Sequence, residues 1–237
     1  MTTFGLHTTT PTLRRTDGLV AEEHPHLREG ARRTLNVVVA AIGLIASAPV
    51  LLCIALAIKL TSRGPVLYKQ QRVGLDLRTA AGENRRQRID LGGRPFTIYK
   101  FRTMRVARSG DEAQVWASAT DPRITPIGGF LRKTRLDEIP QLFNVLQGDM
   151  NVVGPRPEQP AIFQTLRTEV PSYAVRQRVR PGITGQAQIT LHYDTCVDDV
   201  RKKVAADLEY ISKQSLLEDL KIMVLTAPVV IFRKGGG

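Results

Sequence analysis

The sequence predicts an α+β fold that is mostly helical, with one long apolar helix ahead of a compact domain. Residues 35–58 contain no charged side chain, a length typical of membrane-embedded helices. Two short runs, 66–70 and 95–101, contain β-branched and aromatic residues in the pattern of strands. Most of the remaining chain has apolar residues at helical spacing. A small sheet among several helices is therefore expected.

The apolar run is long enough to cross a membrane. As a straight helix, residues 35–58 would extend about 36 Å, against a hydrocarbon core of about 30 Å. Pro49 removes a backbone hydrogen bond in the middle of the run, and Ser47 can satisfy the freed groups. Basic residues flank both ends, namely Arg32, Arg33, Lys59 and Arg63. Since charge gives no orientation, two interpretations stand: a single span, or a helix–break–helix that enters and leaves by one face.

Composition divides the chain into three parts. Residues 1–30 are rich in Thr with scattered charges and predict a disordered tail. Residues 31–60 form the membrane helix, and residues 61–237 have the size of one ordinary domain. The two cysteines, Cys53 and Cys196, lie far apart in sequence. Neither a disulfide framework nor a structural zinc site is expected.

The domain is expected to alternate short strands with helices and one long loop. After the first strand, a polar loop covers residues 75–94, and the second strand follows it. The expected helices cover 127–134, 136–147, 158–169, 197–212 and 215–232. Extended chain is expected over 152–157 and 185–191. Because its apolar content is high and Pro228 interrupts it, the last helix fits either a membrane interface or a soluble core.

An adjacent carboxylate pair, Asp137 and Glu138, stands at the start of the helix expected over 136–147. Thr134 is a plausible N-cap, and Pro140 is tolerated only in a first turn. A carboxylate in a first turn is kept ionised by the helix dipole and the free N–H groups. Such a group can act as a nucleophile or bind a divalent metal. The alternative is an ordinary pair of surface acids that matches the dipole.

The charge balance points to an acidic partner. With 34 Lys and Arg against 22 Asp and Glu, the net charge is +12. The basic residues cluster at Lys100, Arg102, Arg105 and Arg108, at Arg132 to Arg135, and at Arg156, Arg176, Arg178 and Arg180. Nucleic acid is disfavoured, because aromatics are only 5% of residues and no nucleic-acid-binding motif is present. An anionic membrane surface or a phosphorylated substrate fits better.

Four motifs resemble those of a known family. They are GPVLYKQQRVG, FTIYKFRTM, DPRITPIGGFLRKTRLDEIPQLFNVLQGDMNVVGPRPE and RVRPGITGQAQI. Their types and order resemble bacterial sugar transferases of the polyprenyl-phosphate type, the monotopic phosphoglycosyl transferases. The resemblance covers roughly residues 32–234.

The resemblance implies a reaction. Family members transfer a phosphosugar from a nucleoside diphosphate sugar, usually a UDP-hexose or UDP-N-acetylhexosamine, to undecaprenyl phosphate and release UMP. This is the first membrane step in the synthesis of a polysaccharide, O-antigen or glycoprotein glycan. Asp137 matches the family nucleophile, which forms a covalent phosphosugar-aspartyl intermediate, and Glu138 matches its dyad partner. The alternative is a noncatalytic membrane scaffold of an exopolysaccharide assembly complex.

The resemblance also implies phosphate-binding and metal-binding residues. A carboxylate that approaches a diphosphate needs Mg²⁺ and basic groups to neutralise the phosphates. The matching basic residues are Lys100, Arg102, Arg132 and Arg156, with Arg178 and Arg180 as further candidates. The matching metal ligands are Asp137, Glu138 and Asp207.

For the membrane, the resemblance implies a re-entrant helix that breaks at Ser47 and Pro49. Both ends and the domain would then lie at the cytoplasmic face of the bacterial inner membrane, and a homodimer is compatible with this placement. The chain departs from the family pattern where Ala48 separates Ser47 from Pro49. The 75–94 loop is also longer than usual, and Gln186 replaces a common aromatic residue. These departures concern the membrane, sugar and lipid contacts rather than the carboxylate pair.

Overall fold

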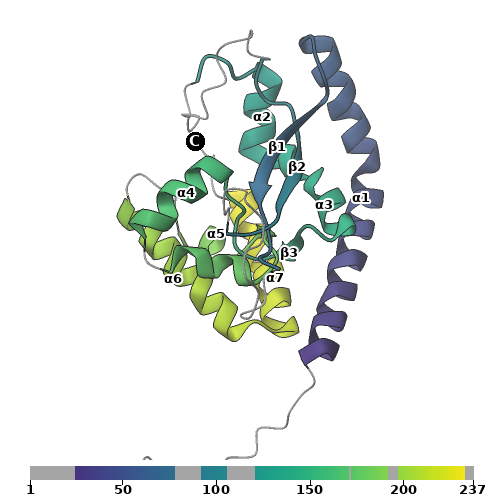
Figure 1. Ribbon diagram of the computed structural model, residues 1–237. Helices are drawn as coiled ribbons and strands as arrows, with labels where there is room; N and C mark the ends of the chain where they lie inside the picture. The colour runs from purple at the N-terminus through teal and green to yellow at the C-terminus, as the bar shows by residue number, and fades with distance from the viewer. Residues whose placement is uncertain (1–24, 78–91, 106–120, 171, 192–196, 233–237) are drawn as a thin grey trace, which may run out of the picture.

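The computed structural model describes residues 25–77, 92–105, 121–170, 172–191 and 197–232 (Figure 1). Within these ranges the chain is mostly helical with two small sheets, as the sequence predicts. Most of the expected 75–94 loop lies outside the described residues, as does the expected tail up to residue 24. The tail prediction is wrong for residues 25–30, which belong to the first helix.

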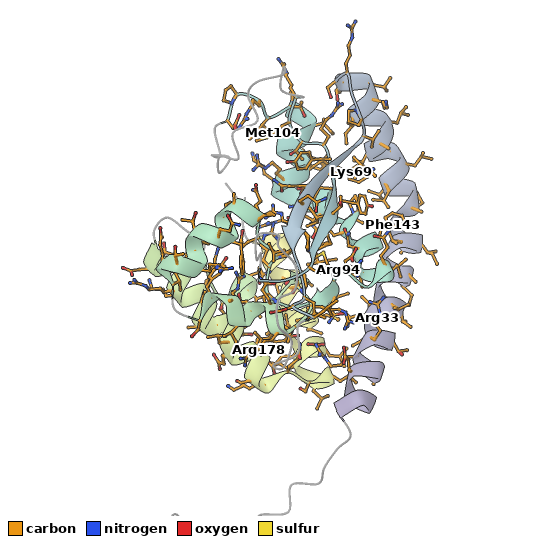
Figure 2. The ribbon with its side chains drawn as sticks, viewed as in Figure 1. Arg33, Lys69, Arg94, Met104, Phe143 and Arg178 are labelled. Carbon is orange, nitrogen blue, oxygen red and sulfur yellow. The ribbon has the colours of Figure 1, made fainter. Side chains whose placement is uncertain are left out.

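Helix α1, Pro25–Thr61, runs along one side of the whole domain (Figure 1). Among the described residues it is the one helix long and apolar enough to cross a membrane. Only 11% of its most apolar window is buried within the protein, which distinguishes it from a core helix. Side chains on its outer face point away from the domain (Figure 2), and several are large and apolar: Val38, Ile42, Ile45, Leu52, Leu56 and Leu60.

The break expected at Ser47 and Pro49 is not confirmed, because α1 continues as helix through both residues. The Ser47 hydroxyl donates a 2.6 Å hydrogen bond to the Gly43 carbonyl, one turn back. A serine bonded in this way occupies a backbone acceptor near the proline and keeps its own hydroxyl satisfied within the helix. The helix therefore accommodates Pro49 without an interruption.

Two short strand pairs form the sheets. Strands β1, Leu67–Val73, and β2, Pro95–Phe101, pair antiparallel from Leu67 opposite Phe101 to Val73 opposite Pro95. Strands β3, Asn151–Val153, and β4, Gly182–Thr184, pair in parallel. The second pair is short because a Gly-Pro turn follows β3 and a short helix follows β4.

Most predicted helices appear with small shifts in their ends. They are α2, Pro126–Thr134, α4, Pro160–Glu169, α6, Val197–Lys213, and α7, Leu216–Phe232. The 3-10 helix η2, Tyr173–Arg178, was not expected. The extended prediction for 185–191 is wrong, since helix α5, Gln186–Thr190, lies there. Backbone bonds from Ile189 to Gly185 and from Leu191 to Ala187 close this turn right after β4.

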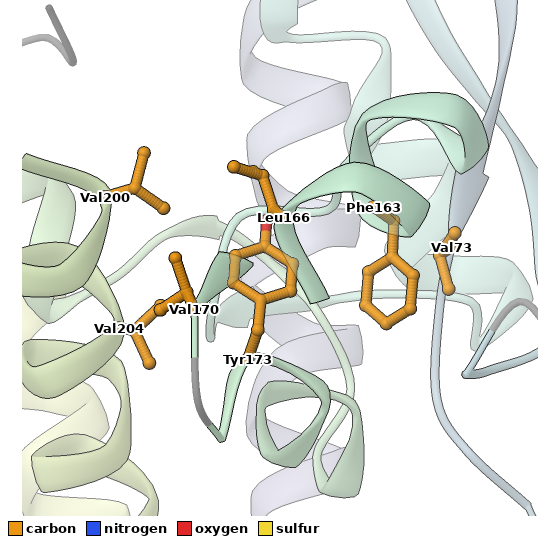
Figure 3. Packing of buried hydrophobic residues seen from close by; sticks show 7 residues of the cluster. All are labelled: Val73, Phe163, Leu166, Val170, Tyr173, Val200 and Val204. Carbon is orange, nitrogen blue, oxygen red and sulfur yellow. The ribbon is translucent and has the colours of Figure 1, made fainter. Parts of the chain in front are cut away.

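An apolar cluster joins β1, α4, η2 and α6 (Figure 3). Its buried members are Val73, Phe163, Leu166, Val170, Tyr173, Val200 and Val204. The rings of Phe163 and Tyr173 lie 5.4 Å apart in a tilted arrangement, which is favourable for aromatic pairs. This packing fixes η2 against α6 and so sets the position of a buried arginine on η2, Arg176.

Candidate active site

The carboxylate pair lies on a 3-10 helix rather than in the first turn of an α-helix. Helix α2 ends at Thr134, and Arg135 takes left-handed backbone angles with φ of 59°. The pair follows on η1, Leu136–Glu138, and α3, Gln141–Gln147, begins only after Pro140. The prediction of one helix over 136–147 is therefore wrong.

The predicted N-cap is also wrong, because the Thr134 hydroxyl bonds back to carbonyls of α2. Pro140 has no N–H to donate to the turn before it, which favours the separation of η1 from α3. With the pair outside the first turn of α3, the dipole argument for an ionised Asp137 does not apply.

Glu138 is held by two cations. Lys100 on β2 donates to Oε1 at 2.6 Å. Arg156, which follows β3, donates Nη2 to Oε1 at 2.6 Å and Nη1 to Oε2 at 3.3 Å. Glu138 is only 8% exposed, so these charge-assisted bonds lie in a low-dielectric setting. The structure thus brings together three of the residues that the sequence singled out.

Asp137 has a different environment, although it is equally buried. Within the described residues, no hydrogen bond reaches its carboxylate. Burial raises the pKa of Asp137 to about 6, and the neighbouring Glu138 charge adds to this, against the attraction of Lys100 and Arg156. For Glu138, burial works in the same direction, but Arg156 and Lys100 outweigh it and hold its pKa well below the usual range. The Glu138 carboxylate is consequently neutralised and fixed by its two cations, whereas the Asp137 carboxylate keeps its lone pairs available.

The Arg156 turn is anchored by a buried ion pair. Arg176 on η2 donates Nη2 to the Arg156 carbonyl at 3.0 Å and Nε to Asp207 Oδ2 at 2.7 Å. The side chains of Arg176 and Asp207 are 6% and 1% exposed, and the guanidinium also lies 4.9 Å from the centre of the Tyr173 ring. Sequence reasoning noted Arg176 only as one of several basic residues. Its partner is 31 positions away on another helix, and no local pattern reveals that pairing.

Asp207 was predicted as a metal ligand, and the structure gives it another role. From α6 its carboxylate pairs with Arg176, and no cluster of three or more metal-ligating side chains occurs in the part of the chain described. Among the described residues, Asp207 therefore does not join Asp137 and Glu138 in one cluster, and Mg²⁺ binding by the pair stays a prediction. One or two carboxylates fit Mg²⁺ where substrate phosphates and water complete its octahedral shell. Asp137, which accepts no hydrogen bond from the described residues, is the acid that fits such an ion.

The remaining predicted basic residues lie in three different settings. Arg102 is buried and donates to the Ser62 and Arg63 carbonyls just beyond α1, so it stabilises that helix end rather than a phosphate. Arg132 lies in the last turn of α2, and its buried Nη1 has no hydrogen-bond partner among the described residues. Arg178 and Arg180 line a separate cavity near the start of α1.

Comparison with known proteins decides the family. The model of the bacterial sugar transferase family matches residues 27–233. The chain belongs to this family. The matched region contains residues 27–61 of α1, the carboxylate pair and α7.

Individual relatives are similar over most of the chain. A UDP-glucose:undecaprenyl-phosphate glucose-1-phosphate transferase of Escherichia coli is 42% identical over 198 residues, which are 82% of this chain and 39% of that protein. One of the same name from Caulobacter vibrioides is 44% identical over 203 residues, 84% of this chain and 69% of its own length. A UDP-N-acetylgalactosamine-undecaprenyl-phosphate N-acetylgalactosaminephosphotransferase of Aeromonas hydrophila is 38% identical over 200 residues, 84% of this chain and 43% of the relative. The chain therefore spans about two fifths of the E. coli and Aeromonas proteins, whose names specify two different sugars.

Proposed function

We propose that this chain transfers a phosphosugar from a UDP-sugar to undecaprenyl phosphate and releases UMP. The observation that carries the proposal is the unequal carboxylate pair. Asp137 is buried without a hydrogen bond from the described residues, beside a Glu138 that Lys100 and Arg156 neutralise. The names of the relatives support the substrate classes, and both glucose and N-acetylgalactosamine occur among them.

In the first proposed step, an Asp137 carboxylate oxygen attacks the sugar-bearing β-phosphorus. An oxygen–phosphorus bond forms to Asp137, the bond to the bridging oxygen breaks, and UMP leaves with that electron pair. In the second step, the phosphate oxygen of undecaprenyl phosphate attacks the same phosphorus. The bond to Asp137 breaks, its carboxylate is regenerated, and the lipid diphosphate sugar is released.

Residues of this chain reduce the electrostatic repulsion between the attacking carboxylate and the diphosphate. A carboxylate and a diphosphate repel each other, and a second free carboxylate next to the nucleophile would increase that repulsion. Lys100 and Arg156 remove the Glu138 charge from this balance. Both cations also lie close enough to Asp137 to lower its pKa, a position from which their charge favours a bound phosphate. Mg²⁺ bound at Asp137 or Glu138 and the substrate phosphates would supply further neutralisation.

A trapping experiment tests the covalent step. Wild-type protein in membranes would be incubated with Mg²⁺ and a panel of labelled UDP-sugars, first without and then with undecaprenyl phosphate. Without the lipid we expect at most one UMP per chain and label attached to the protein; with it, continuous release. Asp137→Asn should do neither, whereas Asp198→Asn, an exposed carboxylate on α6, should match wild type. Equal release by Asp137→Asn would refute the nucleophile, and release by no protein with any sugar would leave the scaffold alternative.

We further propose that the chain is monotopic, with both ends of its apolar helix at the cytoplasmic face of the inner membrane. The support comes from packing along α1. Asn36 and Ala40, near its start, are buried, with Ala40 packed against Phe96 and Val145. Near its end, Ile54 and Ile58 pack against the domain at Phe101 and Leu131. If α1 crossed the bilayer, one of its ends would lie on the side opposite the domain, and the contacts at that end would be lost.

Cysteine labelling tests this topology. In a chain without native cysteines, Gly30→Cys and Arg63→Cys place one thiol before and one after the apolar segment. A Cβ added at Gly30 would have no neighbouring atom within 4 Å, and Arg63 is exposed, so both changes should be tolerated. Labelling of both thiols from the cytoplasmic side is expected. Labelling from opposite sides would show a true span and refute the monotopic placement.

A further inference from the structure

A second basic site lies apart from the carboxylate pair. It is a cavity of about 410 Å³ whose wall includes four arginines, Arg32, Arg33, Arg178 and Arg180, against two acids, Glu29 and Asp76. They come from the first turns of α1, from the end of η2 and from the segment that follows it. Arg33 and Arg178 lie toward the lower end of the molecule, far from Met104 at the upper end (Figure 2). Neither carboxylate of the pair lines this cavity.

Strand β3 separates the two sites. Asn151, its first residue, lines the cavity, whereas Arg156, beyond its other end, contacts Glu138. Lys100 and Arg156, the two cations that contact Glu138, do not line the cavity either, so a ligand held by the cavity's arginines would be distinct from a phosphate at Asp137.

The arginines are fixed by internal bonds that leave donors unused. Arg33 donates to the Val145 and Leu146 carbonyls at the end of α3, and Arg180 donates to the Gly148 carbonyl. Each guanidinium has five N–H donors, and these bonds use one or two of them. The carbonyl partners orient the guanidinium groups without neutralising their charge.

These arginines repel each other. The pKa of Arg33 is lowered by burial and by the nearby charge of Arg180. The carboxylate that contacts Arg180 is Glu29, which is 61% exposed at the rim and so only partly compensates this charge. Arg178, the last residue of η2, is exposed, and its guanidinium makes no hydrogen bond to another described residue. Guanidinium groups held in this way bind phosphate oxygens bidentately.

The cavity lies next to the lipid-facing part of α1, and this position indicates which phosphate-containing molecule could enter it. The apolar run of α1 begins directly after Arg33, and exposed Val38 and Ile42 follow within three turns. The start of α7 is tied to the same place by the ion pair between Arg32 and Asp219, and Leu217 beside it is 78% exposed. Basic groups at the polar end of lipid-facing helices lie at the depth of headgroup phosphates.

We propose that this cavity binds a phosphate ester, and that its source is the headgroup of an anionic phospholipid next to α1. The inference rests on the membrane placement within the proposed function, but not on the transfer reaction. Bound there, the headgroup would be shared between Arg178, Arg180 and Arg33 and would hold the start of α1 at the membrane surface. Glu29 would compete with it for Arg180.

Vesicle flotation of the full chain tests the site. Vesicles of phosphatidylcholine alone and with added phosphatidylglycerol would be titrated with wild type, Arg178→Gln and Glu29→Gln. Loss of one arginine near an anionic surface should weaken the phosphatidylglycerol-dependent binding about five-fold. Glu29→Gln should strengthen it. The matched control is Arg201→Gln, an exposed arginine on α6 outside the cavity, for which a change of less than about two-fold is expected.

Several outcomes would overturn the inference. Equal losses for Arg178→Gln and Arg201→Gln would show a general charge effect, and absence of phosphatidylglycerol dependence in wild type would show no headgroup site. A second arm adds UMP or glycerol phosphate at millimolar concentration. If these displace the protein from the vesicles only when Arg178 is present, the headgroup occupies this site, as proposed. If they bind the chain in the absence of vesicles through Arg178 but leave its flotation unchanged, the source is a soluble phosphate ester and the lipid assignment fails. Asp137→Asn should float like wild type, which separates this test from failure of the transfer reaction.

Discussion

The buried pair of Arg176 and Asp207 allows a decisive substitution, because two roles for Asp207 predict different results. If Asp207 holds Arg176, Asp207→Asn leaves a buried guanidinium without its counter-charge. Breaking a buried ion pair on one side costs about 3–5 kcal/mol. At about 2–4 °C of melting temperature per kcal/mol for a chain of this size, the expected loss is about 6–20 °C. Both side chains are at most 6% exposed, so solvent screening should not reduce this cost much.

The measurement is thermal unfolding of the detergent-solubilised chain, followed by circular dichroism, together with a Mg²⁺ titration of UMP release. A double variant, Arg176→Met with Asp207→Leu, should lose less stability than Asp207→Asn alone, because no buried charge is left unpaired. Since Arg176 also bonds the Arg156 carbonyl, Asp207→Asn should lower turnover at every Mg²⁺ concentration. An unchanged melting temperature with a raised Mg²⁺ requirement would refute the structural role and restore Asp207 as a metal ligand.

Four other substitutions give three separate tests. Arg102→Gln should lower the free energy of unfolding by about 2–3 kcal/mol, because the charged bonds to the end of α1 are lost, while the KM for UDP-sugar stays unchanged. Gly128→Ala should lower the free energy of unfolding by about 1–3 kcal/mol, since a Cβ there would overlap the Thr103 carbonyl. Gly30→Ala, in an open helical position, should raise it by up to about 1 kcal/mol. Urea unfolding of both variants measures the difference. Glu138→Gln should lower both activity and melting temperature, because it removes the buried negative charge that pairs with two partly buried cations. Loss of activity with full stability would show that its role is in the chemistry alone.

Local sequence patterns correctly predicted the strands and helices that the spacing of neighbouring apolar residues determines. Residues 95–101 form β2 with the predicted bounds, because alternating apolar residues match a strand packed on one face. The helix around 197–212 appears as α6, with one face on the apolar cluster. Predictions failed where one residue changes the backbone path. Arg135 in a left-handed conformation and Pro140 together split the segment 136–147, and the apolar spacing alone does not show this.

Contacts between distant segments were the least accessible to sequence reasoning. The charges near Asp137 and Glu138 were expected, but Lys100 and Arg102 stand two residues apart in the same basic motif, and nothing local tells which of them reaches the pair. The fold decides this, because β2 directs Lys100 toward η1, while Arg102, two residues on, reaches the end of α1. Residue type therefore indicated phosphate chemistry, and the tertiary fold selected the side chains that can perform it.

The tertiary fold also gives the two acids of the pair different electrostatic environments. Adjacent carboxylates in one buried turn repel each other, so the arrangement is stable only if at least one is neutralised by protons or by cations. Here Lys100 and Arg156 both contact Glu138 Oε1 and not Asp137. Burial, with the neighbouring Glu138 charge, raises the pKa of Asp137 to about 6 against the attraction of the two cations. An approaching diphosphate or cation would find Glu138 already occupied and Asp137 without donors from the described residues. The proposed nucleophile is thus specified less by its own residue type than by the two cations that bind its neighbour.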